Sequence, residues 1–138
     1  MDISYAATPF MAWLIAGALK FTINSLKAGK LAFGLIGYGG LPSNHSAIVS
    51  SMAALIAFKE GLEHPAFGVA LALAFIVMLD ANSLRRQVGQ HAEALNRLNA
   101  GQISGTPFRE RMGHTRWEIA AGIAVGIGVA AMMVRIGP

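Results

Sequence analysis

Two histidines in this chain stand beside residues that can support proton transfer or nucleophilic attack. His45 lies in a polar, glycine-rich segment with the sequence Gly39-Gly40-Leu41-Pro42-Ser43-Asn44-His45-Ser46-Ala47. His114 lies four residues before Glu118, so on a helix the carboxylate can accept the imidazole N–H. Such a hydrogen bond fixes the tautomer and makes the other ring nitrogen more basic, as a nucleophilic histidine requires.

Cations accompany both histidines. Arg85 and Arg86 are adjacent and can clamp a phosphate with paired N–H donors. Lys20 is the only charge in a long apolar segment, where a buried phosphate would be its partner. Ser43 suits the N-cap of a helix, and free N–H groups at a helix start favour a bound phosphate. Together these residues indicate phosphoryl chemistry through histidine.

Each of these signals also has a purely structural interpretation. Ser43 could cap a turn whose histidine faces the membrane interface, and the arginine pair could be an ordinary interfacial anchor. Thr115 and Glu118 have the spacing of a capping box, which explains the glutamate without catalysis. Lys20 could extend along the helix to the membrane surface. The sequence leaves these alternatives open.

The chain lacks several common catalytic devices. It has no cysteine, which excludes disulfides, thiol nucleophiles and thiolate metal sites. It contains no Walker loop, Gly-x-Ser-x-Gly, GxGxxG or His-Glu-x-x-His motif. Seven acidic residues are too few for a magnesium cage, so we expect neither a metal nor a cofactor.

The elements that position these residues are expected to be membrane helices. The chain has 138 residues, of which 54% are hydrophobic and 13% charged, against about a quarter charged in ordinary soluble domains. A soluble bundle is the alternative, but the polar residues are too few to coat four helices. We therefore predict an all-α fold, a single membrane domain over residues 1–138. Its transmembrane helices number about four, at about 8–26, 43–58, 65–79 and 117–136.

The distribution of charge predicts the topology. The net charge of +4 is concentrated in two loops, at about 27–42 and 80–116, which the positive-inside rule places in the cytoplasm. We accordingly expect an inner or plasma membrane protein whose site faces the cytoplasm. Anionic membrane lipids explain the charge better than nucleic acid does. The N-terminus lacks the features of a signal peptide.

Two further patterns concern packing. Apolar residues recur at steps of three and four in the second loop, which predicts a short cytoplasmic amphipathic helix lying on the membrane surface; they are Leu84, Val88, Ala92, Leu95 and Leu98. Gly122 and Gly126 form a Gly-x-x-x-Gly face in the last span. That face predicts close helix packing, either inside the monomer or in a homodimer.

Four ordered motifs resemble the divergent branch of the type 2 phosphatidic acid phosphatase superfamily. The segment around His45 resembles its GGMPSSHSA signature, and Lys20 matches the lysine upstream of it. Residues 77–81, followed by Arg85 and Arg86, resemble its MYDA-x-GVRR stretch. Gly113-His114-Thr115-x-x-Glu118 resembles its LGHTPxEV. The resemblance covers nearly the whole chain, with Asn44 in place of the second serine of the signature.

The resemblance implies a role for each residue. His114 would attack phosphorus and form a phosphohistidine, Glu118 would orient it, and His45 would protonate the leaving group. The phosphate oxygens would be held by Lys20, Ser43, Asn44, Arg85 and Arg86. The expected function is a metal-independent phosphatase acting on a lipid phosphate or polyprenyl diphosphate. The alternative is a non-catalytic membrane protein that binds or transports a phosphorylated lipid.

Overall fold

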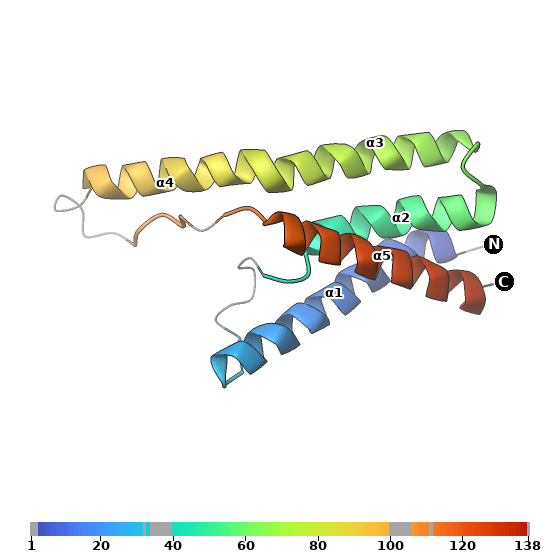
Figure 1. Ribbon diagram of the computed structural model, residues 1–138, viewed down its shortest axis with the longest axis horizontal. Helices are drawn as coiled ribbons and strands as arrows, with labels where there is room; N and C mark the ends of the chain where they lie inside the picture. The colour runs from blue at the N-terminus through green and yellow to red at the C-terminus, as the bar shows by residue number, and fades with distance from the viewer. Residues whose placement is uncertain (1–2, 32, 34–39, 100–105, 111, 138) are drawn as a thin grey trace.

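The computed structural model describes residues 3–31, 33, 40–99, 106–110 and 112–137. All regular structure in these ranges is helical, with no strand. The elements (Figure 1) are α1 (Ser4–Ala28), α2 (Asn44–Glu60), α3 (Pro65–Leu79), the π-helical turn η2 (Asp80–Leu84), α4 (Arg85–Asn99) and α5 (Arg116–Ile136).

Helix α2 forms the centre of the bundle and packs against α1, α3 and α5. Its buried face consists largely of small or hydroxyl-bearing side chains, among them Ser46, Ala47, Ser50 and Ser51. Buried hydroxyls satisfy themselves locally: the Ser50 hydroxyl donates to the Ser46 carbonyl at 2.5 Å. Small residues let helix backbones approach closely, which is how membrane helices gain packing contacts.

The large apolar side chains lie mostly on the outside of the bundle. They include Phe10, Trp13, Leu71, Phe75 and Trp117, all more than half exposed. Water would not tolerate so continuous an apolar surface on a monomer, whereas lipid tails would. The distribution therefore agrees with a membrane helical bundle.

Three helices are long and apolar enough to cross a membrane, namely Ser4–Ala28, Pro65–Asn99 and Arg116–Ile136. This confirms the predicted membrane helical bundle. Helix α2, with 17 residues, is shorter than the ~20 residues that a span usually needs, so the predicted count of four spans is met for three segments. The start of α1, the end of α5 and the α2–α3 turn lie at one end of the bundle, and the first turns of α2 and α5 lie toward the other (Figure 1).

The two glycines of the last span face α2 within the monomer. A Cβ on Gly122 would lie 2.4 Å from the Ser43 carbonyl oxygen, and one on Gly126 would lie 2.1 Å from the Ser50 hydroxyl. The same atom on Gly128 would meet nothing within 4 Å. The Gly-x-x-x-Gly face is thus occupied by intramolecular packing, the first of the two predicted uses.

Helices α3 and α4 form one long rod, interrupted only by η2 (Figure 1). The predicted amphipathic helix therefore exists at 85–99, but it continues the direction of α3 instead of turning onto the membrane surface. The reason is local, because the η2 sequence Asp-Ala-Asn-Ser-Leu contains neither Gly nor Pro to end a helix. The wider turn is accommodated by Ser83, whose hydroxyl donates to the Leu79 carbonyl at 2.8 Å.

Candidate active site at the first turns of helices α2 and α5

Ser43 joins the two helices that carry the candidate site. Its backbone N–H donates to the carbonyl oxygen of Glu118 at 2.9 Å. Its hydroxyl accepts from the Ser46 backbone N–H at 3.3 Å and from the Ser46 hydroxyl at 3.1 Å. Ser43 is fully buried and acts as the N-cap of α2. The observed contacts of Ser43 are thus structural, and its predicted binding of phosphate stays a prediction.

The Glu118 carboxylate contacts both the helix cap and His114. Oε2 accepts from the Thr115 backbone N–H at 2.8 Å and lies 3.3 Å from His114 Nδ1. The Thr115 hydroxyl accepts from the Glu118 N–H at 3.2 Å, completing a capping box. The His114 and Glu118 side chains are only 9% and 12% exposed. The structural and chemical interpretations of this glutamate therefore hold together.

His45 faces His114 across the junction of the two helices. The ring centroids are 6.0 Å apart and the rings are tilted by 54°. The Nδ1 atom of His45 and the Oδ1 atom of the neighbouring Asn44 are buried without a hydrogen-bond partner in the described part of the chain. Buried polar atoms of this kind usually have a partner, so these two mark a place where a polar ligand would be stabilised.

A strap leads the chain back from α4 to His114; we use this name for residues 106–115, of which all but 111 are described. The Asn96 side chain donates to the Phe108 carbonyl and accepts from the Phe108 N–H, each at 2.8 Å. The buried Gly89 allows the strap to lie directly on α4, because a Cβ there would be 2.3 Å from the Glu110 carbonyl oxygen.

The end of the strap is attached to η2. The His114 backbone N–H donates to the Ala81 carbonyl at 2.9 Å. Gly113 precedes it with φ +90°, and a Cβ there would be 3.2 Å from both Ala81 O and Arg86 N. Glycine is therefore required at this close approach. Helix α4 and η2 thus position His114 through its backbone.

The charges around His114 favour its neutral form. Burial is the main cause that lowers the pKa of the His114 imidazole, and the positive charge of Lys20 adds to it. The hydrogen bond to Glu118 opposes both, while Arg85 acts in the same direction as Lys20. Arg85 itself is paired with Asp80, its Nε lying 2.9 Å from Oδ2. Lys20 and Arg85 therefore act on the same site as the histidine pair.

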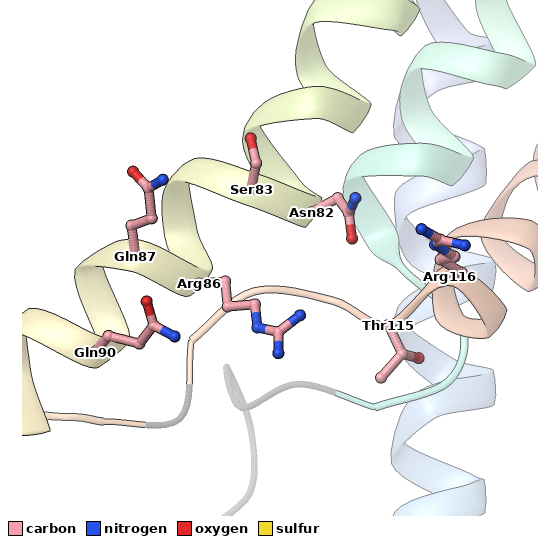
Figure 2. A pocket seen from close by; sticks show the side chains of 7 residues that line it. All are labelled: Asn82, Ser83, Arg86, Gln87, Gln90, Thr115 and Arg116. Atoms are coloured by element: carbon pink, nitrogen blue, oxygen red, sulfur yellow. The ribbon is translucent and has the colours of Figure 1, made fainter.

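Arg86 lies apart from this group. Its side chain lines an open pocket of about 530 Å³ between η2, α4 and the start of α5 (Figure 2). None of the other predicted site residues lines that pocket. The structure thus brings together His45, His114, Glu118, Lys20 and Arg85, with Asn44 and Ser43 beside them, and separates Arg86.

The sequence interpretation missed the polar side chains that accompany Arg86. A usable signal was present, since Asn82, Arg86 and Gln90 recur every four residues. Gly39 of the first motif and Arg111 of the second loop lie outside the described residues. Within the described ranges, no group of three or more His, Asp or Glu residues could hold a metal ion.

Comparison with known proteins places these features in context. The model of the Divergent PAP2 family matches residues 3–129. A relative in Bacillus subtilis (strain 168), the uncharacterized membrane protein YuiD, is 35% identical over 86 residues, which are 62% of this chain and 54% of that protein. The chain thus spans about half the length of this relative. No solved structure matches the chain.

Proposed function

Because the chain belongs to the divergent PAP2 family, we propose that it is a membrane phosphatase that cleaves a lipid phosphate or polyprenyl diphosphate through a phosphohistidine, without a metal. One observation carries the proposal: His114 Nδ1 lies 3.3 Å from Glu118 Oε2, and the His114 ring centroid lies 6.0 Å from that of His45. A single phosphoryl group can contact both rings at this separation. The carboxylate holds the Nδ1–H tautomer, which leaves Nε2 of His114 as the nucleophile.

The first step transfers the phosphoryl group to the protein. His114 Nε2 forms a bond to phosphorus while the bond from phosphorus to the leaving oxygen breaks, and that oxygen keeps the electron pair. His45 gives the leaving oxygen a proton. Glu118 stabilises the positive charge that develops on the His114 ring.

The second step returns the site to its starting state. A water molecule gives a proton to His45 and attacks phosphorus. The bond between phosphorus and His114 Nε2 breaks, its electron pair returns to the nitrogen, and inorganic phosphate leaves. No net change in protonation of the two histidines results, so the cycle is closed.

Three groups are suited to stabilise the charge on the phosphate oxygens. Lys20 and Arg85 supply positive charge to the histidine pair. The backbone N–H groups in the first turn of α2 add the positive end of a helix dipole. The Ser43 N–H is excluded from this set, because it is bonded to the Glu118 carbonyl.

One observation favours the alternative, a non-catalytic protein that binds a phosphorylated lipid. The unpartnered atom of Asn44 is an acceptor oxygen beside His45, and an acceptor repels a fully ionised phosphate oxygen. It suits a protonated phosphate oxygen, which is a ligand for recognition more than for in-line attack. The experiment below distinguishes the two functions.

Phosphate release by the purified protein in detergent tests the proposal. The substrates are a panel of lipid phosphates and isoprenyl diphosphates, with a chelator present throughout. We expect turnover that vanadate inhibits, and a loss of at least about a thousandfold in His114→Ala. The matched control is His91→Ala, an exposed histidine of α4 outside the site, which should keep the wild-type rate.

The outcomes separate the alternatives. An unchanged rate in His114→Ala overturns the phosphohistidine mechanism. Binding of the lipids with no turnover by the wild type, over the whole panel, establishes the binding protein instead. Phosphate release that disappears with the chelator would show that the chemistry depends on a metal.

A further inference from the structure

The open pocket beside the histidine pair has a composition of its own. It measures about 530 Å³, within the usual size range of small-molecule sites. Its wall is made of hydrogen-bonding side chains without an acidic residue: Asn82, Ser83, Arg86, Gln87, Gln90, Thr115 and Arg116. Most ligand pockets are lined mainly by apolar groups, so this one is suited to a polar, charged ligand.

The pocket is built by the packing of two helices. Asn82, Arg86 and Gln90 are four residues apart and so share one face of the η2–α4 helix, while the start of α5 forms the opposite wall. Figure 2 shows the Arg86 guanidinium extending from α4 toward Thr115, and the Asn82 amide lying toward Arg116. The polar groups therefore converge on one space.

The charges in the pocket have no partner. Arg85 and Arg97 each pair with an acid, Asp80 and Glu93 respectively. In the part of the chain that the structure describes, Arg86 and Arg116 make neither an ion pair nor a side-chain hydrogen bond. Two guanidinium groups that face one cavity repel each other unless an anion lies between them.

We propose that this pocket is a second anion site, which binds a phosphate group through Arg86 and Arg116, separately from the histidine pair. The adjacent arginines then serve different sites, because successive residues of a helix point about 100° apart. Arg85 acts on the histidines, whereas Arg86 holds the second phosphate. The phosphate group belongs either to inorganic phosphate or to a phosphorylated lipid headgroup. This inference concerns binding and does not rest on the proposed catalysis.

Side-chain NMR of the whole protein in detergent micelles tests the site directly. With arginine labelled selectively with ¹⁵N, each Nε–H reports its own environment, and single Arg→Gln variants assign the signals. We expect sodium phosphate to shift the Arg86 and Arg116 signals along one binding curve, while sodium chloride at equal ionic strength leaves them in place. Arg97, on the same helix but outside the pocket, is the internal control.

Two sets of variants make the result decisive. Arg86→Gln and Arg116→Gln should each weaken the apparent phosphate affinity about tenfold or more, as expected for loss of a charge-assisted contact. Arg97→Gln should leave it unchanged. In His114→Ala the two signals should still respond to phosphate, because the pocket does not include that residue.

The source of the phosphate group is resolved in nanodiscs. Signals that shift when phosphatidic acid replaces phosphatidylcholine, with no phosphate added, identify a lipid headgroup. Signals that shift only with added phosphate identify the free anion. No shift in either arm, or a response that follows ionic strength alone, overturns the proposal. Loss of the response in His114→Ala would assign the pocket to the histidine site and also overturn it.

Discussion

The backbone N–H of Ser43 is hydrogen-bonded to the backbone carbonyl of Glu118 at 2.9 Å, so the first turns of α2 and α5 are attached directly to each other. His45 lies two residues after one end of this bond, and His114 lies four residues before the other. The separation of the two imidazoles is therefore set by the backbone, not by long flexible side chains. Such preorganisation is what a transfer between two groups requires.

Glu118→Gln should separate the capping role of this residue from its chemical role. The amide oxygen can still accept from the Thr115 N–H, so the helix cap is preserved, but the negative charge beside His114 is lost. We expect the rate of phosphate release to fall by about 10²–10⁴, with little change in thermal stability. Thr115→Ala is the matched control: it removes the capping hydroxyl and should cost about 1 kcal/mol of stability with a smaller loss of rate. Equal losses of rate in the two variants would contradict the chemical role.

The His114 imidazole should titrate below the usual histidine value of ~6.5. Since folding lowers its pKa, the neutral ring is favoured, and this contribution to stability is present above pH ~6.5 and is lost as the pH falls through the folded pKa. The neutral nucleophile, and hence activity, should persist to lower pH than for a free histidine. NMR titration of the ring Cε1–H measures the midpoint, and His114→Ala assigns the signal.

Two variants should move that midpoint in opposite directions. Lys20→Gln removes a positive charge and should raise the pKa of His114, whereas Glu118→Gln removes a favourable negative charge and should lower it. A midpoint at or above 6.5, or one that Lys20→Gln leaves in place in a folded protein, would contradict the observed electrostatics of the site.

Gly126→Ala should destabilise the bundle, since its Cβ would lie 2.1 Å from the Ser50 hydroxyl and 2.6 Å from the Ala47 carbonyl oxygen. We expect a loss of about 1–3 kcal/mol, as for other overpacked cores. Gly128→Ala is the matched control, because nothing lies within 4 Å of its added Cβ. Unfolding by a denaturing detergent, followed by circular dichroism, measures both. Equal stability of the two variants would rule out α2 as the partner of this face.

Gly89→Ala should reduce activity without disturbing the bundle. The added methyl would displace the Glu110 carbonyl and with it the strap that ends at His114. Because a displacement of about 1 Å can cost up to a hundredfold in rate, we expect a loss of about tenfold or more at unchanged helix content. Gly68→Ala, which has open space around it, controls for the added helix propensity. Full activity in Gly89→Ala would show that the strap does not position the histidine.

Much of the fold follows from hydropathy. The apolar segment expected at 65–79 coincides with Pro65–Leu79, and the one at 117–136 begins one residue later than Arg116–Ile136. The close approach of Gly122 and Gly126 was also legible, because small residues at this spacing have few other uses. The direction of α4 was not, since the periodicity of an amphipathic helix states which face is apolar and nothing about its angle to the preceding helix.

The site was predictable where side chains carry the signal. His45, His114 and Glu118 were found by residue type and spacing, and the capping box by its motif. The bond between the Ser43 N–H and the Glu118 carbonyl left no trace, because any residue supplies these atoms. The different positions of Arg85 and Arg86 depend on how far the helix has rotated by that point, and the π-helical turn before them changes that rotation.

The helix from Pro65 to Asn99 has 35 residues and, at 1.5 Å per residue, measures about 52 Å, against about 30 Å for the hydrocarbon core of a bilayer. The surplus of about 20 Å is a lever arm. Its fulcrum is η2, and the load on its short side is the Ala81 carbonyl that holds the His114 backbone. A torque on the far end of α4 is therefore delivered to the nucleophile's own attachment point.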